Sequence, residues 1–314
     1  MPANAEDDKP RIVFVPGMKP KPPPDQHREA LLEVLTAALR RGRPGAERVL
    51  VEHPEILTLV SWTYRFYGEH RDIRLDLPGI ERLIARPEPD ARDRAEIDAL
   101  DKRLSRLIRL LGDALPFLGR LIARPSLRLT MSEVRRYFSD QDGLGTAIRG
   151  SLARELEGAT ERGERVLLIA HSLGSVIAYE TLWELTRRGS AARVDLFVTL
   201  GTPLATRFIR RHLRGADRRG AERYPANVRR WVNFSAKGDE TALHPRLKPF
   251  FGPMVELGLL ESLEDHTGLY NHFRNSAGLN VHEAYGYLMH PLVAGSIADW
   301  LAGAERKDRA RDRA

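Results

Sequence analysis

The sequence contains no cysteine among its 314 residues. This absence excludes disulfide scaffolds, thiol nucleophiles and zinc sites built on cysteine. No stretch is apolar for long enough to span a bilayer, and the segment from Met1 to Lys9 lacks the basic start and apolar run of a secretory signal. We therefore predict a soluble, cytoplasmic protein.

Several motifs that bind metals or cofactors are also missing. The sequence has no H-E-x-x-H zinc motif, no G-x-x-x-x-G-K-[ST] phosphate loop and no dinucleotide fingerprint. We therefore predict a protein that needs no metal and no organic cofactor.

The balance of charge is basic, with a net charge of +7 from 50 Lys and Arg against 43 Asp and Glu. Most arginines alternate with acids, as in Ala91 to Glu96, which is typical of a solvated helix face. Denser basic clusters lie at Arg207 to Arg219 and after Glu305, but they lack the regularly placed aromatics of a single-strand binding platform. We predict no nucleic-acid partner, and an anionic membrane surface stays open as a contact.

Short apolar runs rich in β-branched residues alternate with segments of helical spacing, such as Glu29 to Arg40 and Val176 to Arg188. This alternation predicts an α/β protein with a mostly parallel central sheet and helices on both faces. The length fits one domain over residues 1–314 with a charged tail at 303–314. The predicted strands are Ile12 to Val15, Ile56 to Trp62, Val166 to Ala170, Leu196 to Leu200 and Trp231 to Phe234.

The connection between the second and third predicted strands is far longer than an ordinary crossover. We predict a helical insertion at about residues 80–150, serving as a cap over the site or packing on the domain beneath it. Leucines and isoleucines recur there at helical spacing, with a break at Pro116. These residues are Ile97, Leu100, Leu104, Leu107, Ile108, Leu111, Leu115, Leu118, Leu121 and Ile122, with Arg103, Arg106, Arg109 and Arg120 among them.

The segment from Val166 to Ile177 reads as a buried strand, a sharp turn and a helix, with Ser172 in the turn. A nucleophile elbow has this form, and it needs small residues two positions before and two positions after the serine. Ala170 and Gly174 meet that requirement. Ser172 is therefore the candidate nucleophile, although serine also caps helices in structural roles.

A serine nucleophile needs a base, and the base needs an acid to orient it. In proteins with a nucleophile elbow of this kind, the acid and then the histidine base follow the serine along the chain. We predict His282 as the base because its loop precedes the terminal helix expected from about Pro291 to Leu301. Asp239, which follows a predicted strand through a short turn, is the predicted acid. Glu240 and Asp265 stay open as alternatives, and the other downstream histidines are His212, His244, His266, His272 and His290.

An oxyanion hole requires two backbone donors, one directly after the nucleophile and one from the loop after an early strand. Leu173 N–H is the predicted first donor. Met18 N–H, in the turn Val15 to Met18 where Gly17 permits close approach, is the predicted second.

These residues resemble the α/β-hydrolase superfamily, and more narrowly a group of bacterial hydrolases distantly similar to lipases and GPI inositol-deacylases. The resemblance spans most of the chain. The sequence departs from the family pattern at two positions: the opening motif usually has histidine where this chain has Pro16, and the elbow usually has glycine where it has Ala170. The resemblance rests on Phe14 to Met18 followed by Lys21 to Pro23, Ala170 to Ser175, Trp231 to Asp239, and Asn280 to Leu288.

The resemblance implies an α/β-hydrolase fold and an active serine hydrolase. We expect hydrolysis of a small-molecule or lipid carboxylic ester through an acyl-enzyme on Ser172. Two alternatives stay open: an acyltransferase that uses the same triad, and a catalytically silent protein that binds a lipid or a partner on this fold.

Overall fold

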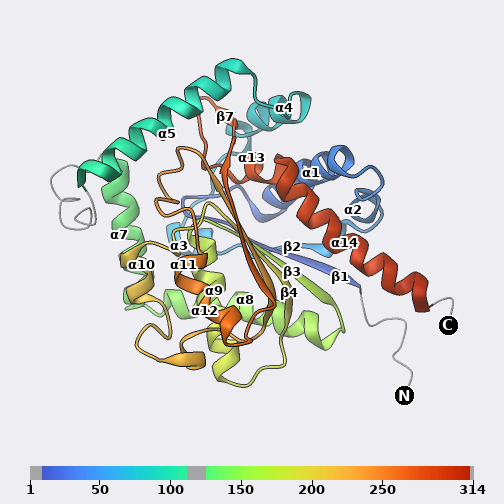
Figure 1. The fold of residues 1–314 in the computed structure, drawn as a ribbon. Coiled ribbons are helices and arrows are strands. Elements are labelled where there is room, and N and C mark those ends of the chain that lie inside the picture. Colours follow the sequence, from blue (N-terminus) through green and yellow to red (C-terminus); the bar gives the residue numbers. More distant parts are fainter. Residues whose placement is uncertain (1–8, 112–124, 312–314) are drawn as a thin grey trace.

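The computed structural model describes residues 9–111 and 125–311 and is built on a six-stranded sheet, with every neighbouring pair of strands parallel (Figure 1). Its strand order is β2-β1-β3-β4-β5-β6. The predicted α/β class with a parallel central sheet is confirmed. The strands are β1 (Pro10–Val15), β2 (Leu57–Leu59), β3 (Arg165–His171), β4 (Val194–Leu200), β5 (Val228–Ala236) and β6 (Ser262–Leu269), and β7 (Arg274–Asn275) and β8 (Gly278–Leu279) form a separate antiparallel pair.

The sixth strand, β6, was not predicted. It lies at the edge of the sheet and reads SLEDHTGL, with only Leu263 and Leu269 buried. A half-exposed edge strand of this kind does not show the continuous apolar run that marks a central parallel strand.

Side chains of the central strands alternate between two apolar layers. Val13 and Val15 of β1 point into one core, whereas Ile12 and Phe14 point into the other. Successive residues of a strand face opposite sides of the sheet, so apolar residues at every position mean that both faces are covered.

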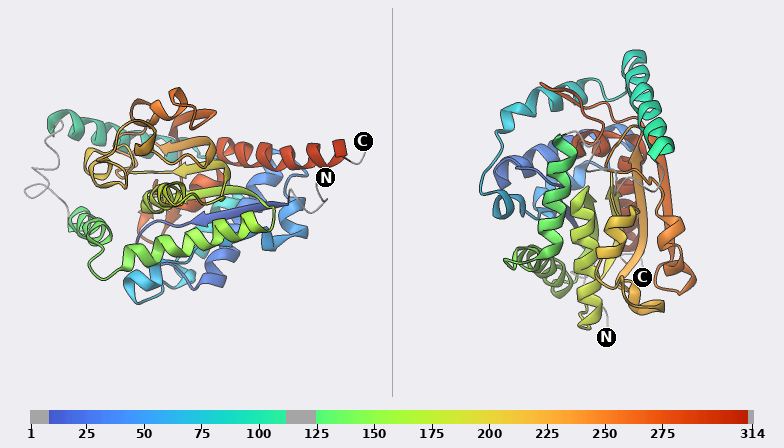
Figure 2. Two further views of the ribbon diagram at one scale, coloured as in Figure 1. Left: turned by 90° about the horizontal axis from the view of Figure 1, so that it is seen from below. Right: turned by 90° about the vertical axis from the view of Figure 1, so that its left-hand side faces the viewer.

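Helices cover both faces of the sheet. In the left view of Figure 2, α14 (Pro291–Arg311) lies on one side of the sheet and α8 (Leu144–Glu161) on the other. Helix α9 (Leu173–Arg187) packs beside α8. Helices α1 (Pro24–Gly42) and α13 (Ala284–Met289) lie in the same layer as α14. The remaining helices are α2 (Arg48–Glu52), α3 (Thr63–Tyr67), α4 (Leu77–Ala85), α5 (Ala91–Leu111), α7 (Pro125–Ser139), α10 (Arg207–His212), α11 (Lys248–Phe251) and α12 (Pro253–Glu256).

The long connection between β2 and β3 holds α3, α4, α5, α7 and α8. Of these, α8 packs directly on β3 and α9, whereas α5 crosses the upper edge of the molecule in Figure 1. In the predicted apolar stripe Ile97 is buried. The positions Leu115, Leu118, Leu121 and Ile122, with Pro116 and Arg120, lie outside the described residues.

Polar contacts join α5 to the loop that follows β5. Asp98 forms an ion pair with Lys237 at 2.8 Å, and Asp101 accepts a hydrogen bond from Gly238 N–H at 3.1 Å. Because this loop leads directly into Asp239, the insertion is anchored next to the predicted acid.

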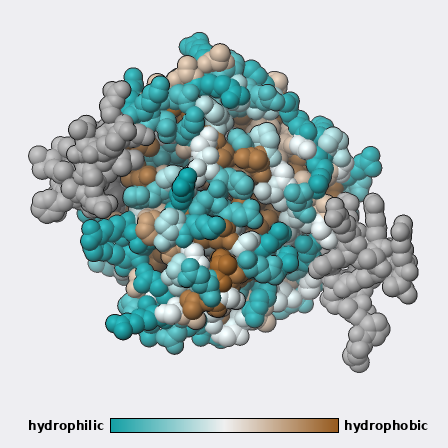
Figure 3. Space-filling model, in the orientation of Figure 1, coloured by the Kyte–Doolittle hydropathy of each residue, from teal (hydrophilic) through white to brown (hydrophobic). Residues whose placement is uncertain are grey.

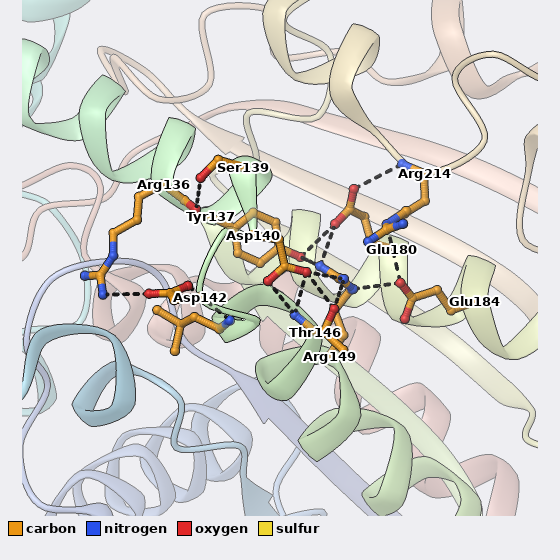
Figure 4. A network of polar contacts seen from close by, with 11 residues as sticks. Arg136, Tyr137, Ser139, Asp140, Asp142, Thr146, Arg149, Glu180, Glu184 and Arg214 are labelled. Atoms are coloured by element: carbon orange, nitrogen blue, oxygen red, sulfur yellow. Dashed lines mark hydrogen bonds and ion pairs between the residues drawn. The ribbon is translucent and has the colours of Figure 1, made fainter.

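A buried cluster of charges joins α7, α8 and α9 (Figure 4). Arg149 of α8, only 2% exposed, contacts Glu180 at 3.5 Å and Glu184 at 2.8 Å, both on α9. Tyr137 of α7 donates to Glu180 at 2.8 Å. We call Tyr137, Arg149, Glu180 and Glu184 the arginine network. It ties the insertion to the helix that begins after Ser172.

The surface seen in Figure 3 is mostly hydrophilic, with apolar residues in separate patches. Among the described residues, the exposed large apolar side chains are scattered over several elements, as on the surface of an ordinary folded protein. None of the described helices combines the length and the apolar character needed to cross a membrane.

Candidate active site

Ser172 stands in the turn where β3 passes into α9. Its backbone has φ 54° and ψ −128°, a conformation that costs a non-glycine residue about 1–3 kcal/mol. Ser172 N–H donates to the Leu200 carbonyl at 2.9 Å, and the Ser172 carbonyl accepts from the Ser175 hydroxyl at 2.6 Å. The strained turn is thus held from both sides, by β4 and by the first turn of α9.

The small residue predicted after the serine is sterically required. A methyl group at Gly174 would collide with the backbone carbonyl oxygens of Val15 and Pro16. Likewise, a methyl group at Gly17 would lie 2.7 Å from Ser172 Cβ. The loop after β1 therefore packs directly against the predicted nucleophile.

The structure brings Ser172, His282 and Asp239 into one hydrogen-bonded chain. Ser172 Oγ lies 2.9 Å from His282 Nε2, and His282 Nδ1 lies 2.8 Å from Asp239 Oδ2. A carboxylate only accepts, so Nδ1 carries the proton and Nε2 is left to accept from the serine hydroxyl. This is the arrangement in which a histidine can take the proton of an attacking serine.

Asp239 is fully buried and fixed by three further groups. Its Oδ1 accepts from Thr241 N–H at 2.9 Å and from Ala242 N–H at 3.4 Å, and its Oδ2 accepts from the Tyr287 hydroxyl at 2.7 Å. Tyr287 in turn accepts from Ala236 N–H at 2.8 Å. Burial, followed by the neighbouring Asp239 carboxylate, raises the pKa of Tyr287 well above its ordinary value, so the hydroxyl stays a donor.

Gly201 closes the site from the side of β4. It has φ 55°, and a methyl group there would lie 2.7 Å from Asp239 Oδ2 and 3.0 Å from His282 Nδ1. The chain turns directly beneath the hydrogen bond between acid and base, and only glycine leaves room for it.

The loop after β1 is braced by two aromatic side chains. Trp62 Nε1 donates to the Pro16 carbonyl at 2.8 Å, and Lys19 N–H donates to the Tyr67 hydroxyl at 3.0 Å. The N–H groups of Met18 and Leu173 meet no acceptor among the described residues. Neither predicted oxyanion donor is thus occupied by another group in the described part of the protein.

His171, between Ala170 and the nucleophile, contributes a contact that sequence reasoning missed. Its ring centre lies 4.6 Å from that of His282, and its Nε2 lies 2.7 Å from the His282 carbonyl oxygen. Burial, followed by the charge of His282, lowers the pKa of His171 well below its ordinary value. His171 is therefore neutral and donates from Nε2 to the backbone of the predicted base.

The alternative acids have other contacts. Glu240 is exposed, and Asp265 accepts from the backbone N–H groups of Leu247 and Lys248 at 2.9 Å each. Of the alternative histidines, His266 stacks on Phe234. Of the candidate acids and histidines, Asp239 and His282 are thus the pair that is hydrogen-bonded to each other and to Ser172.

The contacts of Tyr287, Gly201 and His171 could hardly be predicted from the sequence. Tyr287 and His171 lie within the segments that carry the family resemblance, and no spacing rule assigns them a partner. A glycine directly after a predicted strand was the one local signal for Gly201.

Comparisons of the chain with models of protein families, with curated proteins and with solved structures found no match. Within the described ranges, no group of three or more His, Cys, Asp or Glu side chains is arranged to hold a metal ion. Interpretation of the site therefore depends on its geometry.

Proposed function

We propose that this protein is a serine hydrolase of the α/β-hydrolase fold that cleaves carboxylic esters through an acyl-enzyme on Ser172. The observation that carries the proposal is the hydrogen-bonded chain from Ser172 through His282 to Asp239. A serine that merely capped α9 would need neither a base at its hydroxyl nor an acid behind that base.

In the first half-reaction, Ser172 Oγ attacks the ester carbonyl carbon while His282 Nε2 takes the hydroxyl proton. The carbonyl oxygen becomes an oxyanion, for which the Met18 and Leu173 N–H groups are the donors. The ester bond then breaks, and the alcohol leaves with the proton from His282.

In the second half-reaction, water takes the place of the alcohol. His282 removes a proton from water as the oxygen attacks the acyl carbon, and the bond to Ser172 breaks as the serine regains its proton. Asp239, held by Thr241 and Tyr287, keeps Nδ1 protonated and stabilises the positive charge on His282 in both halves.

The order of the elements supports the fold assignment. A nucleophile between strand and helix, an acid after a later strand and a histidine before the terminal helix match the chain order of α/β-hydrolases. Here Asp239 follows β5, and His282 precedes α13 and α14.

The proposal is tested by labelling with a fluorophosphonate probe and by hydrolysis of 4-nitrophenyl esters from acetate to palmitate. Ser172→Ala should abolish labelling and lower kcat/KM by on the order of 10⁵-fold or more. The matched control is Ser190→Ala, which removes another serine hydroxyl that bonds a side chain, that of Glu157. Labelling of a residue other than Ser172, or equal turnover by Ser172→Ala, would contradict the proposal.

A further inference from the structure

A cavity of about 630 Å³ opens between α10, the segment after it and the start of α11. These elements lie on the left of Figure 1. Four arginines line it, Arg207, Arg210, Arg211 and Arg223, with Asp217 as the one carboxylate. We call this cavity the arginine pocket.

Part of the positive charge of the arginine pocket has no acidic partner among the described residues. The Asp217 side chain is 81% exposed and lies 3.8 Å from Arg218, which is not part of the lining. Among the described residues, no carboxylate forms an ion pair with Arg207, Arg211 or Arg223. The buried Arg149, by contrast, contacts two glutamates at 3.5 Å or less.

Two of the arginines are held in place. The Arg210 guanidinium lies 3.8 Å above the ring centre of Phe250, and its Nε donates to the Ala205 carbonyl at 3.2 Å. Arg223 is half-buried and donates to the Ala216 carbonyl at 3.3 Å. An arginine that is already oriented loses less conformational freedom when it binds a ligand.

The other two arginines repel each other. Arg207 and Arg211 are four residues apart on α10, so their side chains lie on one face of the helix. Like charges at this spacing destabilise a helix, and an anion between them would relieve the repulsion. The pocket therefore favours a ligand with more than one negative charge.

The arginine pocket belongs to the same edge of the sheet as the candidate active site. α10 follows the carboxyl end of β4, and His244, which also lines the pocket, follows Asp239 in the loop after β5. In open parallel sheets, ligands bind beyond the carboxyl ends of the strands.

We propose that the arginine pocket binds the phosphate group of an organic phosphate. Guanidinium groups match phosphate oxygens through paired hydrogen bonds, and a dianionic phosphate neutralises more charge than a carboxylate does. The volume of the pocket exceeds what a phosphate group needs, so it also accommodates the organic part of the molecule. The phosphate can come from a soluble ester or from a phospholipid headgroup.

The test measures binding to the Ser172→Ala protein, so that it does not depend on turnover. One probe is sn-glycerol 3-phosphate in calorimetric titration, and the other is vesicles of phosphatidylcholine with and without phosphatidic acid. Arg207→Gln/Arg211→Gln should weaken binding about tenfold or more, because each lost charge-assisted bond weakens affinity several-fold. The matched control is Arg48→Gln/Arg82→Gln, which removes two exposed arginines from α2 and α4.

The proposal is supported if Arg207→Gln/Arg211→Gln weakens binding of sn-glycerol 3-phosphate and the control variant does not; a soluble ester is then a sufficient ligand. If this selective loss is seen only with phosphatidic acid vesicles, the proposal is also supported, and the ligand is a lipid headgroup. Equal weakening by both double variants, or no binding of either probe, would overturn it. The thermal unfolding midpoint of each variant verifies that the protein is folded, and a result against phosphate binding leaves ester hydrolysis at Ser172 untouched.

Discussion

Two buried polar clusters in this protein are built from similar parts. In the candidate active site, Tyr287 donates to Asp239 at 2.7 Å; in the arginine network, Tyr137 donates to Glu180 at 2.8 Å. Each carboxylate also faces a basic group. That group is His282, 29% exposed, in the first cluster, and Arg149, 2% exposed, in the second.

The difference lies in what the basic group can do. An imidazole gains and loses a proton near neutral pH, whereas a guanidinium keeps its proton. The histidine also has a partner on its far side, the Ser172 hydroxyl, while Arg149 uses its remaining donors on Glu184, Asp140 and Thr146. In the proposed mechanism the first cluster moves a proton, whereas the second holds three helices together (Figure 4).

The largest expected effect is on the rate of ester hydrolysis, when Asp239 of the first cluster is replaced. Asp239→Asn should lower kcat/KM of ester hydrolysis by about 10⁴-fold, because the amide no longer favours the proton on His282 Nδ1. The free energy of unfolding should also fall, by about 1–3 kcal/mol, because the amide NH2 cannot accept the hydrogen bonds that the carboxylate accepts from Thr241 N–H and Tyr287. The kcat/KM is therefore compared per folded molecule. If the variant keeps wild-type kcat/KM in a steady-state assay, Asp239 has no part in catalysis.

The second effect concerns the arginine network. Arg149→Met should lower the free energy of unfolding by about 3–5 kcal/mol, because Glu180 stays buried without its cation. Activity per folded molecule should be unchanged. Urea unfolding measures the loss, and Arg188→Met is the control: its ion pair with Glu157 is partly exposed and should contribute about 1 kcal/mol or less.

The two tyrosines give the closest matched pair of variants. Tyr287→Phe removes a donor to Asp239, and Tyr137→Phe removes one from Glu180. Each should cost about 1–3 kcal/mol of stability, since a buried polar group loses its partner. Only Tyr287→Phe should also lower kcat, by about tenfold. An equal effect of both variants on kcat would remove the distinction between the clusters.

The smallest effect is a dependence of stability on pH. His171 has a folded-state pKa well below its ordinary value of 6.5, because it is buried beside His282. Below pH 6.5 the unfolded chain therefore binds a proton that the folded protein does not, and stability falls as the pH falls. His171→Gln should reduce this slope by up to about 1.4 kcal/mol per pH unit. Urea unfolding from pH 7 down to about 5 measures it; an unchanged slope would show that His171 takes up its proton equally in both states.

The local sequence pattern was sufficient to predict the central strands and the sharp turn at Ser172. Apolar β-branched runs marked β1, β3, β4 and β5 because strands buried on both faces need apolar residues at successive positions. Ser172 could be selected because strand, turn and helix are adjacent in the sequence. The same rule failed at β6, where one half-exposed edge strand carries polar residues.

The partners of Ser172 depend on contacts between distant segments. His282 lies 110 residues after the serine and 43 after Asp239, so no periodicity connects them. The sequence narrowed the candidate acid to Asp239, Glu240 or Asp265, and in the structure it is Asp239 that contacts His282.

By itself, the sequence determined the α/β class, the sharp turn at Ser172 and the order of candidate groups along the chain, because these follow from residues that are neighbours in the chain. Tertiary structure alone decided that Gly201 passes beneath Asp239 and His282, that Tyr287 and His171 hold them, and that four arginines share one cavity. The physical reason is that hydrogen bonds and charges act over a few ångströms, and only packing of the sheet and its helices brings such distant residues that close.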